Sequence, residues 1–371
     1  MSKFQISCHV LLLCLPALGW TQQSVSPAAA QEQPKAAPES PTPALTQRLA
    51  SAPSEAKGRI KLDVVVTDKS GKPVSGLGVE DFALLDNNQP GKILSFQAYD
   101  GTVQKAHPPA EVILLIDTVN LDFQAVSNTR QQIESFLLQN GGHLAAPTSI
   151  FLLTNDGVSV QPEPSLDGNA MAGELKQVEA KLRTINRSAG AWGAVERFEF
   201  SLKMLTAIVD SEGKKPGRKL LIWAGPGWPM LYGPSFNASG KSQRPLFDSI
   251  ARFSTALRQA RIDLYSIALG LPDFSTFLYR DYLKGVRTAE KADNPDLSLK
   301  VLAIQSGGRV LSPSNDLTGE IDTCVQDAGV FYTLSFDPPR ADRANEYHDL
   351  KVTVGKPGLT ARTSSGYYNQ P

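Results

Sequence analysis

Oxygen-bearing side chains follow two strand-like runs of the sequence, residues 112–116 and 149–153. Carboxylate and amide oxygens are the ligands that Mg²⁺ and Ca²⁺ prefer in proteins. A rebuilt divalent-cation site is therefore one interpretation of this pattern. The same residue types also cap helices and close turns, and we favour that second interpretation. The residues concerned are Asp117, Asn120, Asp122, Asn155 and Asp156.

An aromatic-rich stretch follows a third strand-like run, residues 219–223. It begins at the loop that contains Gly225 and continues through Trp228 and Tyr232. Exposed aromatic side chains are common anchors of protein interfaces. Trp228 and Tyr232, together with Gly225 at the start of their loop, are therefore candidate binding residues. The alternative is that the rings cover the sheet edge or pack beneath the loop, and the sequence leaves both interpretations open.

Signatures of catalysis and of cofactor binding are missing from the sequence. Its four His residues are not spaced as a metal pair with another His, Cys or carboxylate. It contains neither the glycine-rich loops that hold phosphates nor a Gly-x-Ser-x-Gly nucleophile elbow. We therefore expect no catalytic residues, no metal ligands, no cofactor and no enzymatic activity.

The element that must position these candidates is the run 112–116, in which all five residues are apolar and three are β-branched. A run of this kind is typical of a strand buried on both faces, at the centre of a parallel sheet. Strand and helix patterns alternate from 106 to 329, which predicts an α/β domain with a doubly wound, mostly parallel sheet. Ligands of such sheets gather beyond the carboxyl ends of the strands, where Asp117 lies. We expect helices near 127–139, 171–184, 194–209, 246–258, 298–305 and 317–326.

The segments on either side of this domain have β character. Strands are expected at 60–66, 80–86 and 92–96, with a turn at 87–88, and again at 330–336, 349–354 and 366–368. The economical arrangement pairs the two sets. Residues 59–105 and 330–371 would then form one β-sandwich-like domain, with the α/β domain of residues 106–329 inserted between them.

The first residues resemble an export signal. Residues 1–21 combine Lys3 with an apolar stretch and small residues at cleavage spacing. Residues 22–58 are rich in Pro, Ala and Gln, which predicts a disordered linker. No later stretch is apolar for long enough to span a membrane, and the formal net charge of zero gives no reason to expect nucleic acid as a partner. We expect an exported protein that is periplasmic, cell-surface or secreted.

Several motifs together resemble the von Willebrand factor A-like proteins of the VWFA-related family, of the type common in acidobacteria. Each motif is weak alone, but their order and spacing span residues 59–368. They are LDVVVTD (62–68), GKPV (71–74), EDF (80–82), ILLIDT (113–118), GRKLLIW (217–223), SGGR (306–309), YTLSF (332–336), YHDLKV (347–352), KPGL (356–359) and GYY (366–368).

The resemblance implies a doubly wound sheet used for adhesion or protein–protein contact. Many A-type domains hold a metal ion through an Asp-x-Ser-x-Ser loop, a Thr from a second loop and an Asp after the fourth strand. Here Asp117 matches the first position, but Val119 and Leu121 replace the two Ser residues. The loop at Gly225 has no carboxylate and the loop at 188–192 has no Thr. The adhesion site is therefore degenerate, and we expect no metal ligands there.

We thus expect an exported, non-enzymatic protein-binding module that acts through the loops around Asp117. The alternative is a structural or assembly component of a cell-envelope complex, with the β-domain as its docking surface. A hydrolase ranks third. The sequence identifies no particular protein partner.

Overall fold

The computed structural model describes residues 58–100, 110–161, 163–178, 190–270 and 275–371. The expected signal and nearly all of the expected linker lie outside the described residues, as do 101–109, where the first domain boundary was expected. In the described part of the chain, no helix combines the length and the apolar character needed to cross a bilayer.

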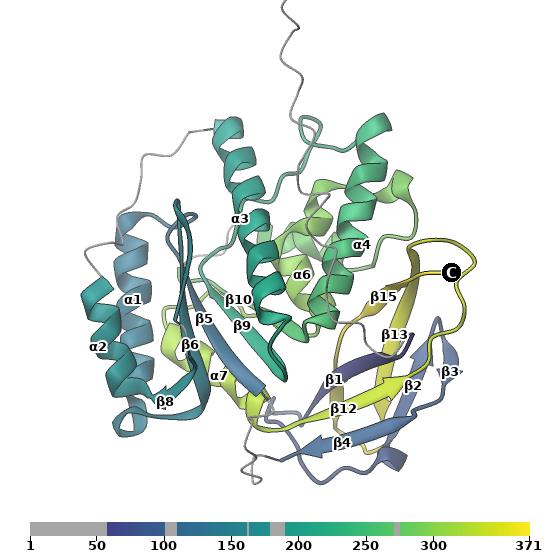
Figure 1. Cartoon of the computed structure of the whole chain (residues 1–371), viewed down its shortest axis with the longest axis horizontal. Coiled ribbons are helices and arrows are strands. Elements are labelled where there is room, and N and C mark those ends of the chain that lie inside the picture. The colour runs from purple at the N-terminus through teal and green to yellow at the C-terminus, as the bar shows by residue number, and fades with distance from the viewer. Residues whose placement is uncertain (1–57, 101–109, 162, 179–189, 271–274) are drawn as a thin grey trace, which may run out of the picture. The chain divides into compact units, whose positions relative to one another are not determined.

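The central sheet has β5 (Ala110–Asp117) at its middle, as the apolar run predicts (Figure 1). β5 pairs in parallel with β6 (His143–Thr154) on one side and β9 (Arg218–Ala224) on the other. β10 (Ile262–Ile267) and the short β11 (Arg309–Val310) extend the sheet beyond β9, and the antiparallel β7 (Gly157–Val160) and β8 (Ser165–Asp167) pair with β6. The chain leaves β5 toward β6 and later returns to β9, so a topological switch point lies between β5 and β9.

Helices cover both faces of this sheet because neighbouring residues of β5 point in opposite directions. Leu114 packs in one hydrophobic core with α1 (Phe123–Leu137), α2 (Gly168–Val178) and α7 (Leu317–Gly329). Leu115 packs in another with α3 (Gly190–Glu212), α4 (Gln243–Gln259) and α6 (Leu299–Ser306). Both side chains are fully buried. The expected doubly wound α/β architecture is confirmed.

The two flanking segments form two four-stranded antiparallel sheets. One has the order β14 (Thr360–Arg362), β1 (Ile60–Thr67), β12 (Phe331–Phe336), β4 (Ser95–Tyr99). The other has the order β15 (Gly366–Asn369), β13 (Glu346–Val354), β2 (Phe82–Asp86), β3 (Gln89–Gly91). Residues of both sheets, such as Val64, Leu84 and Val352, share one hydrophobic core. A β-sandwich-like unit is thus built from the chain before and after the α/β part, as expected.

Some expected elements differ in extent. Asn87 and Asn88 both adopt positive φ, the geometry of a tight hairpin turn, so β3 begins at Gln89. Of the expected strand 92–96, only residues 95 and 96 lie in a strand, at the start of β4, and residues 92–94 connect β3 to β4. The β6–β7 hairpin was not anticipated. Short helical segments complete the fold: α5 (Ser275–Leu278), and the 3₁₀ turns η2 (Val79–Asp81), η3 (Gln139–Gly142), η5 (Gly240–Ser242), η6 (Tyr279–Tyr282), η7 (Ala289–Lys291) and η8 (Asn294–Leu297).

Candidate functional site

Asp117 lies at the switch point, at the last position of β5, and its side chain is completely buried. Its Oδ1 accepts hydrogen bonds from the backbone N–H groups of Val119 and Asn120, each at 2.9 Å. Its Oδ2 accepts from the Asn120 side-chain amide at 2.9 Å and from the indole N–H of Trp223 at 2.8 Å. Four N–H donors therefore surround the carboxylate, which matches its roughly four lone-pair sites.

The charge state of Asp117 follows from these partners. Burial raises the pKa of Asp117, and the hydrogen bonds from Asn120, Trp223 and Val119 oppose that rise. All four partners are donors, so a protonated carboxyl group would place its own O–H against one of them. The geometry therefore suits the ionised form, held by protein dipoles in place of a cation.

Two further residues complete this cluster. The Asn120 amide also donates to Ser201 Oγ, on the buried side of α3, at 3.1 Å, and Asn120 Oδ1 is buried without a hydrogen-bond partner among the described residues. Gly225 passes so close that a Cβ there would lie 3.0 Å from Asp117 Cβ. The structure thus brings together three of the candidates, Asp117, Asn120 and Gly225.

Among the described residues, the other oxygen-bearing candidates form no hydrogen bond with the Asp117 carboxylate. Asp122 is the N-cap of α1, and its Oδ1 accepts from the Ala125 N–H at 2.8 Å. Asn155 and Asp156 form the turn between β6 and β7. Over the described residues, no group of three or more His, Cys, Asp or Glu side chains is arranged to hold a metal ion. These placements match helix capping and turn closure.

The aromatic candidates separate into one buried and one exposed residue. Trp228 is 4% exposed, meets Trp223 edge-on with ring centroids 5.3 Å apart, and donates its indole N–H to the Leu297 carbonyl at 3.0 Å. Of the two interpretations of Trp228, the structure shows packing beneath the loop. Tyr232, four residues later, is 40% exposed.

Sequence reasoning missed three exposed aromatic residues at the same edge of the sheet. Phe123 begins α1 directly after the β5 loop, and Phe277 lies in α5 after β10. Trp192 lies in the first turn of α3. Because α3 ends shortly before β9 begins, its first turn must lie toward the carboxyl edge. The available signal was an aromatic residue at a helix start, where an amphipathic helix does not require one.

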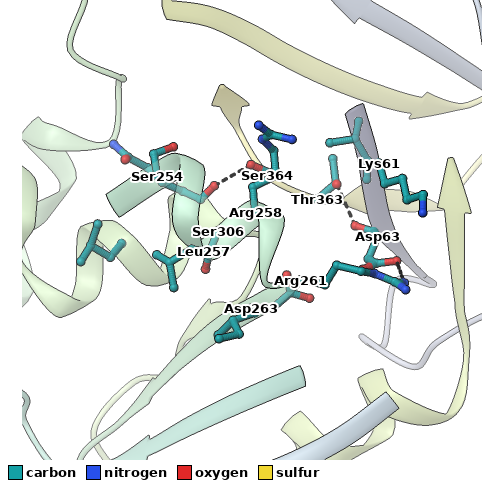
Figure 2. Close-up of a pocket in the computed structure, with 14 residues that line it drawn as sticks. Lys61, Asp63, Ser254, Leu257, Arg258, Arg261, Asp263, Ser306, Thr363 and Ser364 are labelled. Carbon is teal, nitrogen blue, oxygen red and sulfur yellow. Dashed lines mark hydrogen bonds and ion pairs between the residues drawn. The ribbon is translucent and has the colours of Figure 1, made fainter. Parts of the chain in front are cut away.

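A hollow with charged walls lies elsewhere, where β1 meets α4, α6 and the start of β10 (Figure 2). It measures about 500 Å³ together with its open mouth. Its acidic groups are already engaged: Asp63 is paired with Arg261 and Asp263 with Arg218. The hydroxyl of Thr363 donates to the Asp63 carbonyl. Of these contacts, the Asp63–Arg261 pair joins the β-sandwich to the α/β part, so we assign the hollow to that junction.

A buried chain of three polar side chains resembles a catalytic triad without its geometry. His348 Nδ1 lies 2.7 Å from Asp86 Oδ1, and the Tyr367 hydroxyl donates to Asp86 Oδ2 at 2.6 Å. A nucleophilic hydroxyl would have to bond the imidazole. Here the hydroxyl bonds the acid, and His348 Nε2 is buried without a partner in the described structure. The chain cross-links β2, β13 and β15.

Comparison with known proteins yields loose structural matches only. No protein-family model and no curated protein matches the sequence. Among solved structures, human COPII-coat protein Sec24c matches 71% of this chain and 44% of its own, at 11% identity and a TM-score of 0.33. The pilus adhesin SpaC from Lactobacillus rhamnosus GG matches 79% and 49%, at 8% identity and a TM-score of 0.31. The TFIIH p34 N-terminal domain matches 53% and 96%, at 14% identity and a TM-score of 0.25.

This chain therefore spans under half the length of the Sec24c and SpaC chains that it matches. Every one of these TM-scores is below 0.5, so the likenesses say nothing about activity or partners. What the structure establishes is a doubly wound, mostly parallel α/β sheet combined with a β-sandwich-like unit.

Proposed function

We propose that this protein is an exported, non-enzymatic protein-binding module of the VWFA-related type, which binds a protein partner with the carboxyl edge of its central sheet. The degenerate adhesion site serves in this proposal as a rigid frame and not as a metal centre. Asp117 fixes the β5–α1 loop through Val119 and Asn120, and it reaches β9 through Trp223. These hydrogen bonds fix the position of the β5–α1 loop relative to β9 at this edge of the sheet.

The observation that carries the proposal is the distribution of exposed aromatic side chains. Within the described ranges, every aromatic residue that is exposed as a large hydrophobic group lies on a segment at the carboxyl edge. Large aromatic side chains dominate the binding energy of protein interfaces, and they are costly to leave in water without a partner. The four are Phe123 (65% exposed), Trp192 (84%), Tyr232 (40%) and Phe277 (64%), and we call them the aromatic rim.

Helix α3 projects Trp192 outward. At about 1.5 Å per residue, the 23 residues of α3 span roughly 34 Å. The seven residues of the adjoining strand β9 span only roughly 23 Å. Since α3 ends and β9 begins near the same amino edge, the first turn of α3 reaches beyond the sheet, where a partner can contact it (Figure 1).

Site-specific photo-crosslinking tests the proposal. A benzophenone amino acid would replace Trp192 or Tyr232 in the full-length protein, which is then irradiated in its native envelope or culture fraction. Leu138 and Leu166 provide matched control positions, because they are exposed apolar residues near the opposite, amino edge of the sheet. We expect crosslinks to one protein from the rim positions and none from the controls.

The captured protein is then purified and its affinity measured against rim variants. Trp192→Ser and Phe123→Ser should each weaken binding at least tenfold and leave the melting temperature unchanged, because both side chains are exposed. Equal crosslinking from both edges, or unaltered affinity in both variants, would overturn the proposal.

A further inference from the structure

The loop that carries Tyr232 is fastened to η8 by three hydrogen bonds. Trp228 donates its indole N–H to the Leu297 carbonyl at 3.0 Å. The Asn294 side-chain amide donates to the Phe236 carbonyl at 2.6 Å, and the Ala238 N–H donates to Asp293 Oδ1 at 3.0 Å. These contacts bridge residues about 55 to 70 positions apart in the chain. We call this arrangement the η8 bracket.

Two carboxyl groups hold the bracket in shape. Asp293 is the N-cap of η8, and its Oδ1 also accepts from the Asn294 N–H at 2.9 Å. Asp296 closes the capping box by accepting the Asp293 N–H at 2.9 Å through Oδ2. Asp296 is only 3% exposed, and that N–H is the one donor that the structure shows for its carboxyl group within the described residues. Burying an ionised carboxylate with one donor is costly.

The surroundings offer Asp296 little compensation. Burial raises the pKa of Asp296 to about 7; the Asp293 N–H lowers it, and the neighbouring Asp293 carboxylate raises it further. From β15 the phenol of Tyr368 lies near Asp296, and from η6 the phenol of Tyr282 lies near both carboxyl groups. The helices packed against η8 also carry charged residues, and the hydrogen bonds that the structure gives for these residues go to groups other than Asp296. Arg244 bonds to Asp248, Asp248 to Asn345, Arg252 to Ser249, and Lys300 to Ser275 and Thr276.

We propose that the Asp293–Asp296 capping box is a pH-sensitive latch, which holds the Tyr232 loop closed in mildly acidic solution and lets it open more often as the pH rises to neutral. This inference rests on the proposed function only in naming what the loop presents, namely one member of the aromatic rim. The latch itself is a property of the isolated chain. When Asp296 ionises, the capping box holds two carboxylates, and opening η8 relieves both their repulsion and the burial of charge.

The pH window follows from linkage. The pKa of Asp296 is raised in the closed state, so its stabilising contribution is complete below the ordinary value of 3.8 and is lost as the pH rises through about 7. Between about pH 5 and 7, the ratio of open to closed loop should increase about tenfold per pH unit. Above about pH 7 it should level off, because Asp296 is then ionised in both states.

Hydrogen exchange of the full-length protein tests the latch without any partner. Protection factors of the Trp228 indole N–H and the Ala238 amide, corrected for intrinsic exchange, would be followed by NMR from pH 5 to 8. In the wild type, protection should fall by up to about a hundredfold between pH 5 and 7 and then level off. Asp296→Asn should show protection independent of pH, because its side chain cannot ionise.

Two further variants complete the test. Asp281→Asn neutralises an exposed carboxyl on the adjoining η6 and should keep the wild-type pH profile. Asp293→Asn removes the neighbouring charge and should move the levelling point to lower pH. A flat wild-type profile, or a slope that persists in Asp296→Asn, would overturn the latch. Failure to find a protein partner for the aromatic rim would leave these exchange measurements unaffected.

Discussion

The guanidinium of Arg261 donates two hydrogen bonds to the carboxylate of Asp63, from Nε to Oδ2 at 3.0 Å and from Nη2 to Oδ1 at 2.6 Å (Figure 2). Asp63 belongs to β1 of the β-sandwich, whereas Arg261 follows the last turn of α4. Arg261 has a φ of +54°, in the left-handed region where a residue just after a helix is usually Gly. The chain thus tolerates backbone strain in order to place a side chain that ties its two parts together.

Two substitutions at Arg261 distinguish the stabilising contribution of the ion pair from the cost of the backbone strain. Arg261→Ala should lower the free energy of unfolding by about 3 kcal/mol, because it leaves the buried Asp63 carboxylate without its partner. Arg261→Gly loses the same pair but relieves the left-handed strain, so it should be about 1 kcal/mol more stable than Arg261→Ala. Urea unfolding would measure both. Equal stability of the two variants would contradict the strain argument.

Acid should release this contact. Burial would raise the pKa of Asp63, but the charge and hydrogen bonds of Arg261, together with the charge of Arg218 and the hydrogen bond from Thr333, outweigh burial and lower it. The pair therefore stabilises the fold above the ordinary pKa of 3.8, and this contribution is lost as the pH falls through the lowered value. The stability difference between wild type and Asp63→Asn, measured by urea unfolding, should be largest near pH 6 and shrink below about pH 3. A difference that grows on acidification would reverse the sign of this argument.

The architecture was accessible from the sequence because its signals are local. Five successive apolar residues before Asp117 predict a strand buried on both faces, and β5 is that strand. The alternation of strand and helix patterns predicts helices on both faces of a parallel sheet. Returning β character near the C-terminus predicts the pairing of the two flanking segments, which β1 and β12 confirm in an antiparallel register from Ile60 with Phe336.

The candidate site was only partly accessible, because its contacts are not local. Asp117 and Trp223 are 106 residues apart, so the sequence could not show that an indole N–H occupies this carboxylate. Trp228 and Tyr232 are four residues apart and similar in chemistry, yet one is buried and the other exposed. What separates them is the Leu297 carbonyl, which lies 69 residues further along the chain and accepts the Trp228 indole.

The indole of Trp223 should contribute more to the free energy of unfolding than the indole of Trp228. Both rings are buried and both donate one hydrogen bond, so Trp→Phe at each position removes a similar apolar area and one donor. Trp223 donates to a carboxylate, whereas Trp228 donates to a neutral carbonyl. We therefore expect Trp223→Phe to cost about 1 kcal/mol more than Trp228→Phe, as measured by urea unfolding. A larger loss in Trp228→Phe would show that the Asp117 contact is dispensable.

The close approach of Gly227 to α6 predicts a second stability difference. Gly227 (φ +73°) and Gly233 (φ +94°) lie in the same loop and both adopt a left-handed backbone. A Cβ on Gly227 would lie 2.6 Å from a methyl group of Leu299, whereas a Cβ on Gly233 would meet nothing within 4 Å. Gly233→Ala should cost about 1 kcal/mol from strain alone. Gly227→Ala should cost about 1–3 kcal/mol more from overpacking, as measured by thermal unfolding, and equal costs would mean that Leu299 gives way freely.

The occupied carboxylate of Asp117 predicts indifference to divalent cations. A cation that binds the folded state stabilises it in proportion to the logarithm of its concentration over its dissociation constant. To reach Asp117, Mg²⁺ or Ca²⁺ would have to displace N–H donors from Asn120 or Trp223 and find further oxygen ligands nearby. We expect about 10 mM of either cation to leave the melting temperature unchanged relative to NaCl of matched ionic strength.

Asp117→Asn distinguishes a hidden site at this carboxylate from cation binding elsewhere. It removes the charge that a cation would need, and Asp122→Asn provides the matched control on an exposed helix cap of the same loop. A cation-dependent rise in melting temperature that disappears in Asp117→Asn and persists in Asp122→Asn would establish a rebuilt metal site at the switch point. The frame role of Asp117 would then have to be given up, because the same lone pairs cannot hold both the protein donors and the metal ion.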